Sequence, residues 1–217
     1  MRNRQFYDYL KKRSDDSFPG ESAHEQMLPS PKDHSKRFPR HDDGSGHPSS
    51  VLIPLFPDQN GDIEVILTLR TGNIRHAGQI SFPGGRSEVN ESPAETALRE
   101  THEEIGIRPE SIQIACNISS LYLYRSNNLI TPFVGFMDHK PDLTINPNEV
   151  EEAFTVPLSR LLDDQALVRE NWEIDNREVD VPYWDIHPTT PLWGATAMIM
   201  SELLFLYRDF LHQIKQN

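Results

Sequence analysis

Three glutamates within residues 93–105 are the side chains best suited to chemistry, namely Glu100, Glu103 and Glu104. A helix turns by about 100° per residue, so the three carboxylates fall within about 100° of one another. Like charges at this spacing repel by roughly 0.2–0.5 kcal/mol per pair, and the helix dipole disfavours negative charge towards the carboxyl end. A bound cation would offset both costs, and Mg²⁺ prefers oxygen ligands. The pattern therefore indicates either a divalent-metal site or a solvated acidic helix face.

The helix that must position these glutamates has clear ends. Ser92 is a suitable N-cap, Pro93 fits the first helical position, and Glu95 completes a Ser-x-x-Glu capping box. Gly106 is a natural left-handed stop. The other side of the helix carries a stripe that can pack on a core, made of Ala94, Ala97, Leu98, Thr101 and Ile105.

The surroundings of the helix favour the metal site over the solvated face. Arg99 lies one turn before Glu103 and can neutralise or orient it through an i,i+4 contact. Residues 82–85 read Phe-Pro-Gly-Gly and lead towards the helix through a turn that glycine accommodates easily. Such a turn also lets the backbone approach a ligand or a metal closely.

The same residues resemble a known family motif. Their spacing is similar to the Nudix box, G-x5-E-x7-R-E-U-x-E-E-x-G-U, in which U is aliphatic. The matched positions are Gly85, Glu91, Arg99, Glu100, Glu103, Glu104, Gly106 and Ile107. Thr101 stands at the first U and can turn its methyl group inward. The resemblance implies an α/β fold of the Nudix type, an α/β/α sandwich with a mixed β-sheet, and metal-dependent pyrophosphate hydrolysis.

The resemblance also implies roles for the glutamates. Glu100 and Glu104, one turn apart, are the expected metal-bridging pair for Mg²⁺ or Mn²⁺. Glu103 is either a third metal ligand or the general base, and we count it with Arg99 and Glu100 as catalytic. Arg99 would hold a glutamate in place.

Four further positions carry supporting roles by the same resemblance. Backbone oxygen in the Gly84-Gly85 pair completes the metal coordination, with Gly84 as the expected ligand. Glu91 supports the junction between loop and helix from outside the metal's ligands. Glu149 is a candidate additional acid, because many Nudix enzymes recruit one from beyond the box; the alternative is a surface residue in an acidic loop.

A second resemblance concerns the substrate. Residues 67–85 are similar to the signature upstream of the Nudix box in coenzyme A pyrophosphatases, L-L-T-x-R-(S/A)-x3-R-x3-G-x3-F-P-G-G. This implies a substrate of coenzyme A or an acyl-CoA, giving 3',5'-ADP and (acyl-)4'-phosphopantetheine, with Arg70, Arg75 and His76 contacting it. The chain departs from the signature in two places: Thr71 replaces the small residue, and the segment between Arg70 and Gly78 is one residue shorter.

The departures leave two alternatives open. The first is a Nudix pyrophosphatase for another nucleoside diphosphate derivative, such as ADP-ribose or a dinucleotide. The second is a catalytically silent Nudix module that binds a nucleotide or a partner. The intact set of three glutamates argues against the silent module, which has no need of self-repelling carboxylates.

Composition bounds the class of protein. At 217 residues, 36% hydrophobic and 25% charged, the chain fits one globular domain with extensions. Its single cysteine, Cys116, excludes an internal disulfide framework. A net charge of −12 argues against nucleic-acid binding. The start lacks the apolar run of a signal peptide, and no stretch approaches the roughly 20 apolar residues of a membrane span. We therefore expect a cytoplasmic enzyme with a small-molecule substrate, no membrane partner and, as is common among relatives, a homodimer.

We divide the chain into an N-terminal helix and irregular arm at 1–49 and the Nudix domain at 50–217. The first 14 residues predict a helix with Phe6, Tyr9 and Leu10 on one side. This side can dock on a partner or a membrane surface or pack on its own domain, and we expect the packing. Period-two patterns predict strands at 51–55, 63–69, 112–119, 129–135 and 153–157, with a hairpin turn at 58–61. We also expect a short helix at 158–163, a polar hairpin at 170–183 and a long helix at 192–214.

Overall fold

The fold was described from a computed structural model, which covers residues 2–13, 18–31, 44–72, 78–174 and 176–216. Its centre is an eight-stranded sheet in which the strand order β4-β3-β2-β8-β6 forms the main path. The strands are β2 (His47–Pro57), β3 (Ile63–Arg70), β4 (Ile80–Ser81), β5 (Gly84–Arg86), β6 (Gln113–Asn117), β7 (Leu121–Leu123), β8 (Asn128–Phe136) and β9 (Val150–Pro157). Strands β2 and β8 run parallel, whereas the other paired strands are antiparallel. The sheet is therefore mixed, as the resemblance implied.

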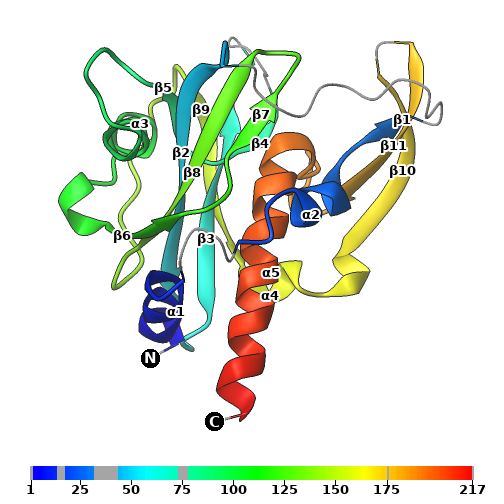
Figure 1. The fold of residues 1–217 in the computed structure, drawn as a ribbon. Coiled ribbons are helices and arrows are strands. Elements are labelled where there is room, and N and C mark those ends of the chain that lie inside the picture. Colours follow the sequence, from blue (N-terminus) through cyan, green and yellow to red (C-terminus); the bar gives the residue numbers. More distant parts are fainter. Residues whose placement is uncertain (1, 14–17, 32–43, 73–77, 175, 217) are drawn as a thin grey trace.

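Helices cover both faces of this sheet (Figure 1). Helix α3 (Pro93–Ile105) packs on one face, where Ala97 and Ile105 join a buried cluster with Leu52 and Ile66 of the strands. Helix α5 (Gly194–Gln216) packs on the other face in a larger cluster that includes alternate residues of β3, such as Leu67. Apolar residues on both sides of the strands are what a sheet buried between helices requires. The predicted α/β/α sandwich is confirmed.

Helix α3 begins and ends as predicted. The Ser92 side chain accepts a hydrogen bond from the Glu95 amide, the Glu95 carboxylate accepts one from the Ser92 amide, and Gly106 is left-handed at φ 76°. Thr101 is fully buried and donates to the Ala97 carbonyl at 2.6 Å. Its hydroxyl is thus satisfied within the helix, so the buried stripe accepts threonine where the motif has an aliphatic residue.

The predicted strands and helices are present with shifted ends. The 170–183 hairpin is longer, comprising β10 (Leu167–Ile174) and β11 (Arg177–Trp184), and it forms a second sheet with β1 (Ser30–Pro31). The short helix is α4 (Leu158–Leu161), and 3-10 turns occur at Pro109–Ser111 and Asp164–Ala166. Strands β4, β5 and β7 were not predicted, because two or three residues are too few to show a period.

Helix α1 (Arg2–Lys11) packs on the domain, as its spacing predicted. Phe6 and Leu10 are fully buried, and the Phe6 ring lies 5.0 Å from that of Tyr207 on α5. The division of the chain at residue 49 stays a prediction, although β2 already begins at His47.

Part of the arm is more regular than expected. Residues 18–31 contain helix α2 (Glu21–His24), a 3-10 turn at Glu25–Met27 and strand β1. Ala23 and Met27 are buried, and His24 pairs with the fully buried Glu202 of α5 at 2.9 Å. These contacts with α5 are long-range, so the local polarity of the segment could not reveal them. Among the described residues, no helix combines the length and apolar character that crossing a bilayer requires.

Candidate active site

Three carboxylates from two separate elements converge at one end of the sheet. Glu100 and Glu104 lie one turn apart on α3, and Glu149 directly precedes β9; one oxygen of each lies within 4.8 Å of the others. The loop before β9 is fastened to the helix, because the Asn146 amide donates to the Glu104 carbonyl at 2.9 Å. The Asn146 side-chain amide also donates to Glu149 at 3.2 Å. The helix end and the loop thus fix the third carboxylate relative to the first two.

Glu104 is the buried member of this carboxylate trio. Its side chain is 2% exposed, and Arg70 of β3 lies 3.6 Å from it. Burial raises the pKa of Glu104 to about 8, which the nearby Arg70 opposes and the negative charges of Glu100 and Glu149 reinforce. Among the described residues, Glu104 Oε2 has no hydrogen-bond partner. A buried carboxylate that is incompletely paired is what a cation site requires.

Glu100 lies directly against the glycine loop. An ideal Cβ at Gly85 would stand 2.4 Å from the Glu100 carboxylate, so no larger residue fits without moving that side chain. A Cβ at Gly84 would stand 2.4 Å from the backbone oxygen of Ser50 on β2. The paired glycines therefore permit two close approaches at once. Burial also raises the pKa of Glu100, against the opposing effect of its partner Arg99.

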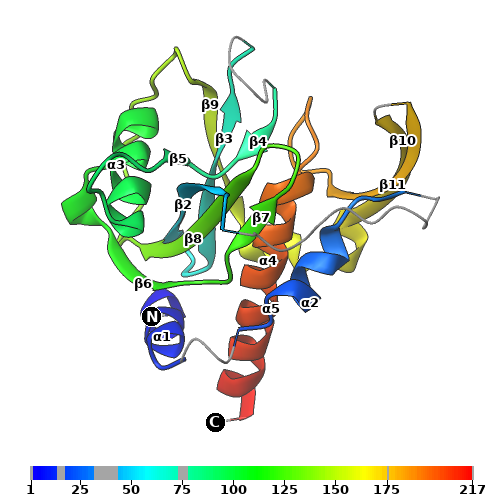
Figure 2. The ribbon, with the colours of Figure 1, turned by 45° about the horizontal axis from the view of Figure 1, so that its top comes forward.

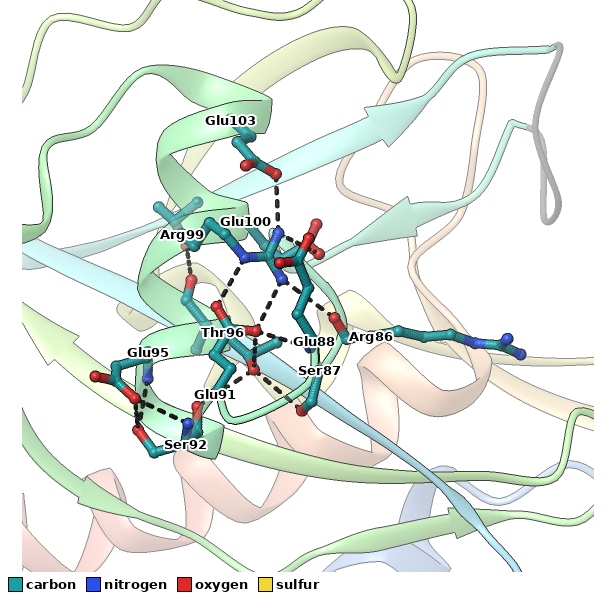
Figure 3. Close-up of polar contacts among 12 residues, drawn as sticks. Arg86, Ser87, Glu88, Glu91, Ser92, Glu95, Thr96, Arg99, Glu100 and Glu103 are labelled. Carbon is teal, nitrogen blue, oxygen red and sulfur yellow. Dashed lines mark hydrogen bonds and ion pairs between the residues drawn. The ribbon is translucent and has the colours of Figure 1, made fainter.

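Arg99 connects three of the four glutamates of the motif, Glu91, Glu100 and Glu103 (Figure 3). Its Nε and Nη2 donate to the two oxygens of Glu91 at 2.8 and 3.1 Å, and its Nη1 donates to both Glu100 and Glu103 at 2.9 Å. The Arg99 hydrogen bonds hold the pKa of Glu91 at about 2, well below its usual range. Thr96 adds a hydrogen bond to Glu91 at 2.7 Å. The predicted Arg99–Glu103 contact is present.

The remaining sequence-predicted residues divide into three groups. Glu103 contacts Arg99 but is outside the trio, and its side chain is 51% exposed. Arg70 lies at the trio, paired with Glu104. Arg75 and His76 lie outside the described residues. The roles of all these residues stay predictions.

Sequence reasoning missed two supporting contacts. Thr96 of α3 is fully buried and donates a hydrogen bond to Glu91 at 2.7 Å, which helical spacing alone does not indicate. Asn146 fastens Glu149 through its side-chain amide at 3.2 Å. An Asn-Pro-Asn-Glu sequence at residues 146–149 is typical of a turn, and this was the available signal.

An α/β/α sandwich that carries clustered carboxylates beside a glycine loop defines an α/β protein with a candidate divalent-metal site. Comparison with known families narrows this class. The family model of the NUDIX domain matches residues 46–178, and this chain belongs to the Nudix hydrolase family.

Individual relatives agree with the family. The chain is 31% identical over 210 residues to Nudix hydrolase 3 of Caenorhabditis elegans, a match that covers 87% of this chain and 86% of the relative. It is 36% identical over 124 residues to the peroxisomal coenzyme A diphosphatase NUDT7 of Mus musculus, covering 56% of this chain but only 52% of the relative. A Nudix hydrolase structure from M. smegmatis, RenU, superposes with a TM-score of 0.52 at 16% identity, covering 77% of this chain and 87% of that one. The last likeness concerns the fold alone.

Proposed function

We propose that this Nudix hydrolase cleaves the pyrophosphate bond of coenzyme A or an acyl-CoA. The products are 3',5'-ADP and 4'-phosphopantetheine or its acyl form. The observation that carries the proposal is the trio of Glu100, Glu104 and Glu149, placed beside the segment that resembles the coenzyme A pyrophosphatase signature.

The residues fit a divalent cation, Mg²⁺ or Mn²⁺. The trio supplies carboxylate oxygens within 4.8 Å of one another, and Glu104 keeps a buried oxygen without a hydrogen-bond partner among the described residues. Backbone oxygen of Gly84 would complete the ligand set. When bound, the metal neutralises negative charge on the pyrophosphate and activates a water molecule.

The other side chains handle the substrate and the proton. Arg70 places positive charge next to the trio, where a phosphate oxygen would lie. Glu103 is the exposed acid of the motif and acts as general base; Arg99 Nη1 binds both its carboxylate and that of Glu100, at 2.9 Å each. Arg99 and Glu91 position both Glu100 and Glu103. Arg75 and His76 are proposed to contact the substrate from the signature segment.

The choice of coenzyme A is supported by two separate likenesses. One is the upstream signature, and the other is the 36% identity to a mouse protein named as a coenzyme A diphosphatase. A second relative, ndx-8 of C. elegans, is also named as a peroxisomal coenzyme A diphosphatase, at 32% identity. The segment between Arg70 and Gly78 argues against coenzyme A, because it is one residue shorter than in the signature. Cleavage of ADP-ribose or a dinucleotide is therefore the alternative substrate class.

A side-by-side product assay tests the proposal. Purified protein with Mg²⁺ or Mn²⁺ receives coenzyme A, ADP-ribose, NADH and a nucleoside triphosphate at equal concentration. The expected result is 3',5'-ADP from coenzyme A, formed much faster than any other product and lost in Glu103→Gln and Glu104→Gln. If another substrate is cleaved faster, that substrate takes the place of coenzyme A in the proposal, and metal-dependent pyrophosphate hydrolysis stands. If the folded, metal-loaded protein cleaves none of these substrates, the proposed activity is wrong and the catalytically silent binding module is the interpretation that stands.

Location and assembly are part of the proposal. We expect a cytoplasmic homodimer, but related proteins carry peroxisomal, mitochondrial and chloroplastic names. Microscopy of a tagged chain and light scattering of the purified protein test these two points.

A further inference from the structure

Three aromatic side chains form a cluster outside the carboxylate site. They are Trp172 of β10, Tyr183 of β11 and Trp193, which directly precedes α5. The Trp172 ring lies 5.4 Å from Tyr183 and 5.2 Å from Trp193, the latter at 75°. Each of the three is only partly buried, whereas the neighbouring Trp184 is 4% exposed. The aromatic cluster thus presents apolar ring surface to solvent, which is typical of a binding surface.

The aromatic cluster lies next to the segment that leads to the carboxylates. Thr196, one turn after Trp193, donates to the Ile80 carbonyl of β4 at 3.0 Å. The chain then runs from Ile80 to Gly85, which abuts Glu100. Five residues span at most about 18 Å, and Figure 2 shows the segment before α5 between β4 and the β10–β11 ribbon. A substrate held by its pyrophosphate at the trio can therefore extend an arm towards the aromatic cluster.

Charge decides which part of a substrate fits there. Glu170 accepts hydrogen bonds from the Trp172 indole at 3.2 Å and from the Tyr183 hydroxyl. This exposed carboxylate repels a phosphate-bearing group. It accepts hydrogen bonds from amide N–H groups, and the rings provide apolar contact for an alkyl or acyl chain.

We infer that the aromatic cluster of Trp172, Tyr183 and Trp193 binds the uncharged, amide-containing thiol or thioester arm of the substrate. The inference rests on the proposed function, because coenzyme A carries such an arm beyond its pyrophosphate. It keeps the phosphate-bearing 3',5'-ADP half away from Glu170.

A binding experiment tests the inference without catalysis. The two products, 4'-phosphopantetheine and 3',5'-ADP, are titrated separately while tryptophan emission is recorded. The sequence has three tryptophans, two of them in the aromatic cluster. We expect 4'-phosphopantetheine to change the emission at lower concentration than 3',5'-ADP does, and Trp172→Ala to weaken this binding about tenfold through lost apolar contact. Asn171→Ala is the matched control, because Asn171 is the adjacent, exposed residue of the same strand.

A kinetic experiment separates a binding role from a structural one. The substrates are coenzyme A and the methyl ester of 3'-phospho-ADP, which keeps the pyrophosphate but lacks the arm. Trp172→Ala is expected to raise KM for coenzyme A about tenfold with kcat unchanged, and to leave the methyl ester unaffected. If Trp172→Ala fails to fold, Trp172→Leu keeps the apolar bulk without the ring and takes its place.

The outcomes distinguish the two proposals. Equal losses on both substrates overturn the inference while the proposed function stands. If the wild-type protein cleaves no coenzyme A, the proposed function fails, and a 4'-phosphopantetheine response that depends on Trp172 still supports the arm-binding surface. No response to 4'-phosphopantetheine, or an equal response in Trp172→Ala, overturns the inference.

Discussion

Arg99 donates two parallel hydrogen bonds to Glu91, from Nε to Oε1 at 2.8 Å and from Nη2 to Oε2 at 3.1 Å. This pair fixes the plane of the guanidinium, and its remaining Nη1 then faces Glu100 and Glu103 at 2.9 Å each. A residue on the loop thus determines the orientation of two acids on the helix.

Arg99→Lys should reduce activity more than stability. Lysine keeps the charge but cannot form the two-point contact with Glu91, so Glu100 and Glu103 lose their common partner. We expect kcat to fall by about 10–100-fold, the effect usual for residues that orient metal ligands. Steady-state kinetics and thermal unfolding measure the two effects. Unchanged kcat would show that the acids are held without Arg99.

Gly85→Ala should disrupt the metal site. The new Cβ would stand 2.4 Å from the Glu100 carboxylate, so that carboxylate must leave its position. We expect Mn²⁺ affinity, followed by titration calorimetry, to fall at least about tenfold. Gly72→Ala is the matched control, since its Cβ would meet nothing within 4 Å among the described atoms. Equal affinities in the two variants would falsify the close contact at Gly85.

Without metal, the free energy of unfolding should fall as pH rises from about 4.5 to about 8. Burial raises the pKa of Glu104 from 4.5 to about 8 in the folded state. In this interval the folded protein holds a proton on Glu104 that the unfolded chain has released, so rising pH favours unfolding. Denaturant melts at several pH values in the presence of a chelator measure the trend.

Two variants test the assignment to Glu104. The glutamine of Glu104→Gln cannot ionise, so the free energy of unfolding of this variant should lack the fall between pH 4.5 and about 8. Glu151→Gln changes an exposed position of β9, and its free energy of unfolding should keep that fall. Mg²⁺ should release part of a proton from Glu104 at pH 7, seen as a binding enthalpy that changes with the ionisation enthalpy of the buffer. Identical pH curves for the wild type and Glu104→Gln would assign the trend to other groups.

Glu149→Gln should weaken metal binding although Glu149 lies outside the sequence motif. One of its oxygens lies within 4.8 Å of those of Glu100 and Glu104, so the substitution removes one of the trio's three carboxylates. We expect Mn²⁺ affinity to fall about tenfold, with little change in thermal unfolding. The same variant at Glu151 serves again as control. If Glu149→Gln binds Mn²⁺ as tightly as the wild type, the site consists of the α3 carboxylates alone.

Local signals were enough to predict helix α3 and its family. Its capping box, its left-handed stop and the spacing of its acids act within a few residues, so they are readable in sequence and are present in the structure. The Arg99–Glu103 contact belongs to the same class, because an i,i+4 pair follows from helix geometry alone.

Only the tertiary structure decided which acids come together. Helical spacing grouped Glu103 with Glu100 and Glu104, whereas the fold brings Glu149 to that pair and leaves Glu103 half-exposed beside Arg99. The sequence pattern and the structure group different acids because Glu149 is far from the helix along the chain. Glu149 lies 45 residues beyond Glu104 in the sequence, and its position depends on how β9 pairs with β3 and how Asn146 binds the helix end. The burial that raises the pKa of Glu104 likewise depends on the sheet packed against it, which no local pattern encodes.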